Sequence, residues 1–382
     1  MSNQIHSLKQ LFVKSKIKFS LFLALVLILL GGVISFLGLL AGNFSREMFY
    51  VNHDYVSDIK MESISALPPL INFDCNASRI VLKQSQDKNI TVEYDANLID
   101  FDCTEDHLKI RSSANSPKYS GYKWYRTINN GIIYTPEEVI LNIPKGYSGD
   151  IELQVPYGDI SFAGIDAASI SVSSNNGDIE LSEVTAAKNL RVNSEYGRMK
   201  LDNINCARRL DLESSNGNIS LKNISAEDFQ SDNQYGSTTI EYLDTETLSV
   251  MTNNGDIDLS SVNADSSIFI NDYGLSSLSD VSGKELELNS GSGEIELANV
   301  MMEDYIRAEC QYGDIRLRDS YGRNMILFSE NGSIKGRINA PKSSFDIIYN
   351  IGSYDDAKFN SGGSSLLYGT NYGSTDISFQ DD

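Results

Sequence analysis

The feature that most constrains the fold of this chain is a glycine that recurs every 19 to 21 residues through its second half. The residue before the glycine is tyrosine in nearly every second unit and asparagine in most of the others. A period of this length indicates one supersecondary unit stacked many times, so chain length is no guide to the number of domains. We expect a structural corner at each of these glycines: Gly158, Gly177, Gly197, Gly217, Gly236, Gly255, Gly274, Gly293, Gly313, Gly332, Gly352 and Gly373.

Each unit also carries a fixed pattern of apolar residues. After Gly177 they stand 2, 4, 7, 9, 13 and 15 positions further along, and the next unit repeats this spacing. Residues two apart point to the same face of a strand, so one unit contains three short strand pieces separated by corners. Glycine suits a corner because it adopts a positive φ angle without a Cβ clash.

One such unit cannot bury its apolar face alone, whereas stacked units bury a continuous core and pair their backbones about 4.8 Å apart. The sequence therefore predicts an all-β fold, a parallel β-solenoid (a single-stranded β-helix) with about 19–20 residues per coil. A β-propeller or a sandwich is the alternative, since two units together match the length of a propeller blade. Each single unit already repeats the full core pattern, which half a blade would not do.

An uncharged run at residues 19–42 is long enough to cross a bilayer as a helix, which takes about 20 residues. A cleaved signal peptide is the alternative, but the run is too long, and leucine stands where a cleavage site needs a small residue. Lysines precede the run, and positive charge stays on the cytoplasmic side. We therefore expect a cytoplasmic basic tail at residues 1–18, one transmembrane helix at 19–42, and the bulk of this single-pass protein outside the cell membrane.

The exported part divides into a stalk at residues 43–65, irregular solenoid coils at 66–150, and the regular glycine-marked solenoid at 151–382. The chain has 31 basic and 52 acidic residues, and four of the basic ones precede residue 43, so the exported part has a net charge of −25. Such an acidic surface argues against nucleic acid as a partner and against general adhesion to anionic lipid. We expect the charge to keep the exported part soluble at the cell surface.

Aromatic residues mark two candidate contact surfaces. We expect the tyrosines before the corner glycines to pack over the corners, with a tyrosine-lined binding strip as the alternative. Residues 112–136 interrupt the repeat with a basic, aromatic stretch. It is either a contact loop for a glycan, a lipid headgroup or a partner protein, or a loop folded over the solenoid flank with Trp124 buried, which we favour. The candidate contact residues are Lys118, Tyr122, Lys123, Trp124, Tyr125 and Arg126.

The four cysteines fall into two groups. Cys75 and Cys103 both occur in Phe-Asp-Cys and are followed by matching apolar residues. If the 28 residues from one to the other form one coil, the two sulfur atoms stack within bonding distance, so we predict a disulfide in the oxidising exterior. Cys206 and Cys310 occupy recurring small-residue positions about five coils apart, and we expect both to be buried free thiols.

The sequence contains no combination of residues typical of an enzyme or a metal site. None of the three histidines has a nucleophile or a metal-ligand pattern beside it. Aspartate follows the glycine in several units, and paired carboxylates on a solenoid can serve carbohydrate cleavage or Ca²⁺ binding. These aspartates are Asp159, Asp178, Asp256 and Asp314. Other units have Arg198, Asn218 or Ser333 there, which indicates turn chemistry, so we expect no catalysis, cofactor or metal.

The segment EEVILNIPKGYSGDIELQVPYGDI, followed by NGDIEL, NGNISL, NGDIDL and SGEIEL, resembles the bacterial putative-adhesin family of β-strand-repeat envelope proteins, whose function is unknown. The resemblance covers about residues 66–378. It implies an N-terminal anchor, a solenoid and a surface location, but no reaction and no functional residues. We expect a membrane-anchored adhesion or envelope-interaction module that binds a surface protein or a glycan. The alternatives are a carbohydrate-active β-helix enzyme and a structural spacer or scaffold in the envelope.

Overall fold

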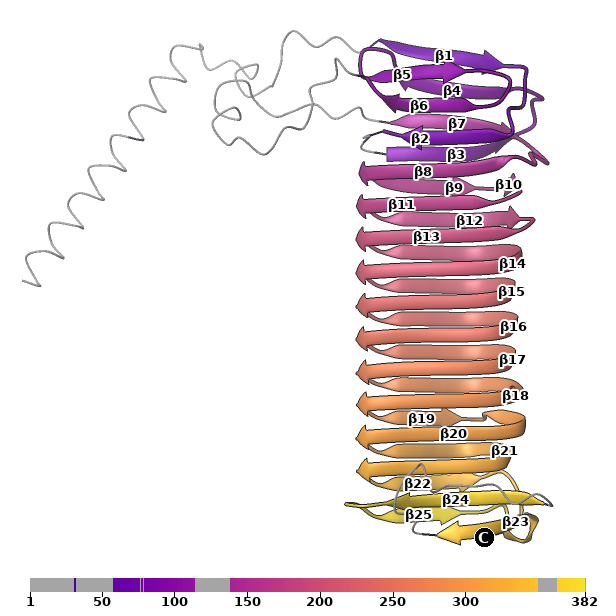
Figure 1. Ribbon diagram of the computed structural model, residues 1–382, viewed down its shortest axis with the longest axis vertical. Helices are drawn as coiled ribbons and strands as arrows, with labels where there is room; N and C mark the ends of the chain where they lie inside the picture. The colour runs from indigo at the N-terminus through magenta and orange to yellow at the C-terminus, as the bar shows by residue number, and fades with distance from the viewer. Residues whose placement is uncertain are drawn as a thin grey trace, which may run out of the picture. The chain divides into compact units, whose positions relative to one another are not determined.

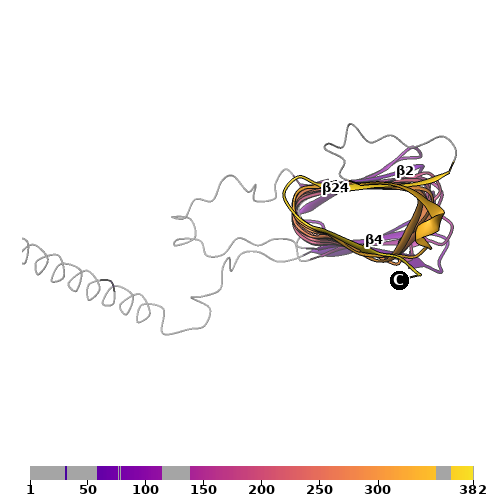
Figure 2. The ribbon, with the colours of Figure 1, turned by 90° about the horizontal axis from the view of Figure 1, so that it is seen from below.

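The structure, a computed structural model, describes residues 31, 58–75, 77, 79–113, 138–349 and 363–381. Those from 58 onward stack as a β-solenoid of about 11 turns (Figure 1). Seen from its end, the solenoid is a flattened ring with two long walls (Figure 2). Among the residues described, no helix has the length and apolar character that a membrane crossing requires. Apart from residue 31, the predicted tail at 1–18 and membrane segment at 19–42 lie outside the described range.

The regular solenoid begins with several short strands and continues with one long, bent strand in most coils. The short strands are β8 (Asp150–Tyr157), β9 (Asp159–Ala163), β10 (Asp166–Ala167), β11 (Ile170–Asn176), β12 (Ile179–Ala186) and β13 (Asn189–Tyr196). The later coils are β14 (Met199–Asn216), β15 (Ile219–Tyr235), β16 (Thr238–Asn254), β17 (Ile257–Tyr273), β18 (Ser276–Ser292), β19 (Ile295–Ala298) with β20 (Met301–Tyr312), and β21 (Ile315–Asn331).

Successive coils pair in parallel, and each residue lies beside its equivalent in the next coil. Leu181 pairs with Leu201, and Leu201 pairs with Leu221. All three leucines are buried, so equivalent apolar side chains form continuous columns inside the ring. The prediction of an all-β, parallel β-solenoid is therefore confirmed.

A column of glycines runs along one edge of the solenoid. A Cβ atom added to Gly197 would lie 2.1 Å from the carbonyl oxygen of Gly177, and one added to Gly217 would lie 1.9 Å from that of Gly197. Gly197 has a φ of 141°, which favours glycine. Gly217 has no φ in that region, yet it meets the same steric limit. The close contact between coils therefore requires glycine even where the turn conformation does not.

The predicted corner glycines from Gly158 to Gly332 all lie in this column. The next member is Gly373, because a Cβ atom added to it would lie 1.9 Å from the carbonyl oxygen of Gly332. The predicted corner at Gly352 lies outside the described residues, and the column steps directly from Gly332 to Gly373. The last coil is therefore longer than the others, and hydrogen bonds join residues 41 apart, such as Ser333 and Ser374.

A second corner lies six residues after the glycine, where residues other than glycine have φ angles between 53° and 60°. Asparagine and aspartate tolerate this conformation best, but glutamate, serine and tyrosine also occupy it. Neighbouring side chains can bond here, since Asn223 Nδ2 donates to Asn203 Oδ1 at 3.0 Å. The sequence predicts a corner between these strand pieces, but it does not reveal the positive φ because the residue types vary. Its members are Glu183, Asn203, Asn223, Tyr242, Ser261, Asp280, Asn299 and Asp319.

Both ends depart from the regular coil. At the N-terminal end, β2 and β3 pair in parallel with β8 and β9, but β1 and β7 flank β4 in antiparallel register, and β5 and β6 form an antiparallel pair. Antiparallel strands cover an open edge that a stack of coils would leave exposed. The strands here are β1 (Ile59–Ile64), β2 (Leu70–Asp74), β3 (Arg79–Ser85), β4 (Ile90–Asp95), β5 (Ile99–Cys103), β6 (Leu108–Ser112) and β7 (Val139–Pro144).

At the C-terminal end, β24 stacks in parallel on β21, and β25 stacks on β22. β23 pairs with β24, and a short 3-10 helix precedes β23. These elements are β22 (Ile334–Ile338), η2 (Lys342–Ser344), β23 (Phe345–Tyr349), β24 (Ser364–Thr370) and β25 (Thr375–Ser378).

The substitution Gly217→Ala tests the stacking contact apart from any need for a positive φ. We expect it to lower the free energy of unfolding by about 2 kcal/mol or more, because the new Cβ atom forces neighbouring coils apart. Gly363→Ala is the matched control, since a Cβ atom there would have nothing within 4 Å. Denaturant unfolding followed by circular dichroism measures both variants, and equal stabilities would contradict the stacking requirement.

Candidate functional site: the tyrosine edge

The residues before the corner glycines form a continuous row, here called the tyrosine edge. They pair coil by coil without a gap from Tyr157 to Asn331. Tyrosine alternates with an amide or hydroxyl side chain, and no member of the row carries a charge. In order, the row is Tyr157, Asn176, Tyr196, Asn216, Tyr235, Asn254, Tyr273, Ser292, Tyr312 and Asn331.

The tyrosines of this edge face solvent. Tyr196, Tyr235 and Tyr273 are 55%, 55% and 60% exposed. Successive tyrosines stand two coils apart, about 9.6 Å, which exceeds the roughly 4.5–7 Å at which aromatic rings pack together. The row is therefore a series of separate aromatic platforms with polar side chains between them. Packing over the corners and a tyrosine-lined binding strip both stay predictions.

The carboxylates that follow the corner glycines act as clips between coils. Asp159 Oδ1 accepts a hydrogen bond from the backbone N–H of Asp178 at 2.9 Å, and Asp178 Oδ1 accepts one from that of Arg198 at 2.8 Å. The same bond recurs at Asp256 and Asp314. Each carboxylate thus satisfies a backbone donor of the next coil, which gives the repeated Gly-Asp pair a structural role.

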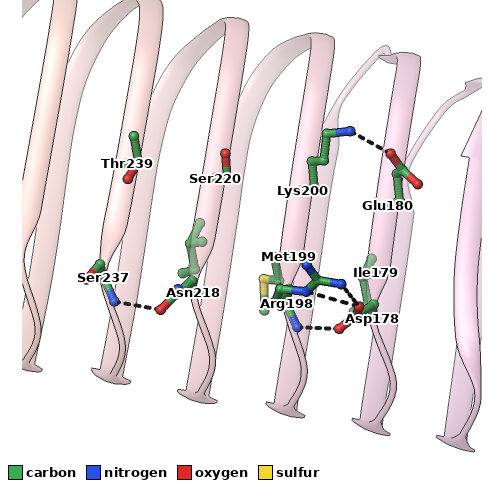
Figure 3. A pocket seen from close by; sticks show the side chains of 11 residues that line it. Asp178, Ile179, Glu180, Arg198, Met199, Lys200, Asn218, Ser220, Ser237 and Thr239 are labelled. Carbon is green, nitrogen blue, oxygen red and sulfur yellow. Dashed lines mark hydrogen bonds and ion pairs between the residues drawn. The ribbon is translucent and has the colours of Figure 1, made fainter.

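A groove of about 510 Å³ lies beside these clips, along β12, β14, β15 and β16 (Figure 3). Its charged side chains pair with one another: Arg198 Nη2 lies 2.6 Å from Asp178 Oδ2, and Lys200 Nζ lies 2.8 Å from Glu180 Oε1. The hydrogen bond from the Arg198 side chain lowers the pKa of Asp178 and keeps that carboxyl ionised. A glycosidase acid needs a raised pKa, so the lowered pKa of Asp178 does not suit that role.

The structure places His107 in the turn between β5 and β6. Its Nδ1 lies 3.1 Å from Thr104 Oγ1, and its Nε2 lies 3.6 Å from an Asp102 carboxylate oxygen. Across the part of the chain that the structure describes, no group of three or more His, Cys, Asp and Glu side chains is placed to hold a metal ion.

Cys75 and Cys103 are free thiols and do not lie in successive coils. β5 turns back antiparallel on β6, which places Cys103 beside Leu108. β6 pairs in parallel with β2, so Leu108 lies beside Ile71, four residues before Cys75. β5 therefore lies two strands from β2 and runs opposite to it, so the residues between the two cysteines do not form one coil, and the geometric premise of the predicted disulfide does not hold.

Cys206 lies in the core slot that the repeat assigns to it. It pairs with Ala186 in the preceding coil and with Ala226 in the following coil, and it is 2% exposed. Burial raises the pKa of its thiol. A buried thiol of this kind fills the space of a small apolar side chain.

Cys310 belongs to a row of small polar residues three positions before each glycine. Its Sγ donates to the carbonyl oxygen of Gly293 at 3.0 Å. Ser329 Oγ makes the equivalent bond to the carbonyl oxygen of Gly313 at 2.8 Å. The same carbonyl groups that exclude a Cβ atom from the next glycine are thus satisfied by side chains inside the ring.

The six candidate contact residues of the basic, aromatic stretch lie outside the residues that the structure describes. Their role as a contact loop, or as a loop with Trp124 buried, therefore stays a prediction. Among the residues that the structure describes, the tyrosine edge is the candidate contact surface. Its signal in the sequence was the alternation of tyrosine and asparagine before glycine, but the sequence does not indicate whether such tyrosines are covered or exposed.

These features define a class of protein: a parallel β-solenoid with a glycine corner in each coil and aromatic residues beside it. The family model described as Toastrack DUF4097 matches residues 70–227 and 207–342. The two matches together span more than half of the chain, and the chain therefore belongs to this family. None of the curated proteins matches the sequence significantly.

Three solved bacterial structures are detectably similar to the chain. A putative adhesin from Bacteroides fragilis is 12% identical, with 85% of this chain and 98% of that chain covered and a TM-score of 0.29. A putative cell adhesion protein from Clostridium sporogenes is 8% identical, with 85% and 100% covered and a TM-score of 0.25. A putative lipid binding protein from Parabacteroides distasonis is 14% identical, with 84% and 97% covered and a TM-score of 0.30. These values are too low to support any inference about this chain.

The substitutions Asp178→Ala and Asp178→Asn separate the two contributions of the Asp178 carboxylate to stability, its charge and its hydrogen bond to the next coil. The folded pKa of Asp178 is lowered, so its contribution to stability is present above the unfolded pKa of about 3.9 and is lost as pH falls through the folded value. We expect Asp178→Ala to cost up to about 1 kcal/mol at neutral pH, because the ion pair is exposed.

Asp178→Asn keeps an acceptor for the Arg198 N–H and is expected to cost less than Asp178→Ala. Unfolding curves at a series of pH values measure both variants. The difference between wild type and Asp178→Ala should shrink as the pH drops below the unfolded pKa. A difference that stays constant with pH would show that the charge plays no part.

Thiol labelling tests the positions of the cysteines. Burial raises the pKa of Cys75 to about 12, and the thiolate is the reactive form, whereas Cys103 is partly exposed. We expect a thiol reagent near neutral pH to modify Cys103 alone in the native protein, and all four cysteines after unfolding without a reductant. Mass spectrometry counts the labels, with Cys103→Ser as the control. If only two cysteines are labelled after unfolding, the protein contains a disulfide, as predicted for Cys75 and Cys103.

Proposed function

We propose that this protein is a non-catalytic interaction module of the cell envelope, a β-solenoid that binds a surface protein or a glycan through its tyrosine edge. In this proposal a single-pass helix at residues 19–42 holds the solenoid on the outer face of the cell membrane, with the N-terminus in the cytoplasm. The uncharged length of that segment and the lysines before it support the anchor and its orientation.

The observation that carries the proposal is the exposure of the tyrosines on one edge. Tyrosine is enriched at binding hot spots, because a large rigid ring buries much area for little loss of side-chain entropy. Tyr196, Tyr235 and Tyr273 are more than half exposed, so burial in the core does not account for them. Their recurrence along a rod supports a surface that binds an extended partner at several points.

The two alternatives make different use of the same molecule. A carbohydrate-active enzyme needs a carboxylic acid with a raised pKa, whereas the pKa of Asp178 in the groove is lowered by its basic partner Arg198. A spacer or scaffold needs only the length and stiffness of the rod. A spacer would not need the tyrosine edge, so substitution of the tyrosines distinguishes a spacer from a binding module.

We expect the triple variant Tyr196→Ser, Tyr235→Ser, Tyr273→Ser to bind isolated cell envelopes of its own organism at least about tenfold more weakly than wild type. Its melting temperature should hardly change, because exposed side chains contribute little to stability. Co-sedimentation of the full-length protein, purified in detergent, measures the binding.

Tyr242→Asn is the control for this experiment. Tyr242 is an exposed tyrosine at the second corner, away from the tyrosine edge, and its φ of 60° suits asparagine. Envelope binding by this variant should equal that of wild type. If the triple variant also binds like wild type, the edge is dispensable and the spacer function is favoured.

A further inference from the structure

We infer that the tyrosine edge binds a neutral, unbranched, β-1,4-linked polysaccharide laid along the solenoid axis, with one disaccharide for every two coils. The inference rests on the proposed function and names the ligand class for that edge. It follows from the spacing of the row, the chemistry of its side chains and the charge around it.

The spacing of the row is uniform although the coils differ in length. Tyr196, Asn216 and Tyr235 pair directly across successive coils, as do the members on either side of them. The register shifts lie in the middle of the coils, for example between Cys206 and Arg209. The extra residue of a longer coil is absorbed there, so the tyrosines stay aligned and repeat every two coils, about 9.6 Å. A regular row of this kind matches a ligand that is itself a straight polymer.

The side chains of the row match the two kinds of surface on a pyranose ring. Tyrosine offers an aromatic face to the C–H face of a sugar, and the amide of asparagine both donates and accepts hydrogen bonds with hydroxyl groups. In an extended β-1,4-linked chain, neighbouring sugars are turned over, so the same ring face recurs once per disaccharide. That repeat is close to two coil heights. Each tyrosine can then receive one sugar face, while the polar residue between tyrosines meets the next sugar.

The charge around the edge selects a neutral polymer. The row has no charged member, but it is flanked by the clip carboxylates, including Asp159 and Asp256. The exported part as a whole has a strong negative charge, which repels polyanions along the full length of the rod. An acidic polysaccharide of the same geometry is therefore disfavoured, and a neutral one pays no such electrostatic cost.

The test uses the full-length protein in detergent and measures co-sedimentation with insoluble polysaccharides. Microcrystalline cellulose and chitin are the β-1,4-linked neutral probes. Insoluble amylose tests the linkage geometry, and carboxymethyl cellulose immobilised on beads, which keeps the β-1,4 linkage, tests the charge. We expect binding to cellulose or chitin and little to the other two. The variant Tyr196→Ala, Tyr235→Ala, Tyr273→Ala should lose at least about tenfold in affinity.

Two further variants check that the rings themselves are responsible. Replacing the same three tyrosines by phenylalanine keeps the aromatic faces and should retain most of the binding. Tyr242→Asn removes an exposed tyrosine elsewhere and should bind like wild type. Equal losses in the alanine and phenylalanine variants, or equal binding to amylose or carboxymethyl cellulose, would overturn the inference.

The remaining outcomes separate this inference from the proposed function. Absence of binding to both β-1,4-linked probes, with tyrosine-dependent binding to cell envelopes intact, overturns the ligand class and leaves the proposed function standing. If neither polysaccharide binding nor envelope binding depends on the tyrosines, both the inference and the proposed function are overturned. Analytical ultracentrifugation tests whether a second copy of the chain binds the tyrosine edge instead of a polysaccharide. A dimer that depends on the tyrosines, without polysaccharide binding, would also overturn the inference.

Discussion

The rest of the structure depends on the contact between the corner glycine of one coil and the glycine carbonyl oxygen of the coil before it. A Cβ atom at Gly217 would lie 1.9 Å from the carbonyl oxygen of Gly197, so only glycine allows the coils to reach the spacing of a β-ladder. Because the contact recurs at the same point of every coil, it fixes the register at that edge. The leucine columns of the core and the tyrosine edge are aligned by the same register.

Some of the polar groups that this stacking brings together are satisfied by neighbouring coils. Asp178 accepts the N–H of Arg198 in the next coil, and Cys310 and Ser329 donate to glycine carbonyl groups inside the ring. The acidic residues after the glycines are therefore part of the scaffold. The residues just before the glycines are different, because Tyr196 and its equivalents are largely exposed. A binding function is therefore best sought at residues that take no part in holding neighbouring coils together.

Much of the fold could be predicted because the repeat states the same physical requirement many times. Cys206 was placed correctly among the alanines of its slot, since the period alone defines that slot. The β5–β6 hairpin, whose turn follows Cys103, occurs once, so no repetition reveals that β5 runs opposite to β6. The backbone conformation of the second corner could not be predicted, because the bend of the coil imposes a positive φ there on residues as unlike as Asn223 and Tyr242.

The sequence by itself determined the period of the solenoid, the core slots, the glycine corners from Gly158 to Gly332 and the alternation of tyrosine with asparagine. These are local patterns, and local spacing is enough to show them. The tertiary structure decided that the column passes from Gly332 directly to Gly373 and that several of the first strands pair in antiparallel register. It also decided that the tyrosines of the edge are exposed. Each of these depends on which segments pair across a distance in the chain and on what covers a side chain, and neither is encoded in the spacing of residues.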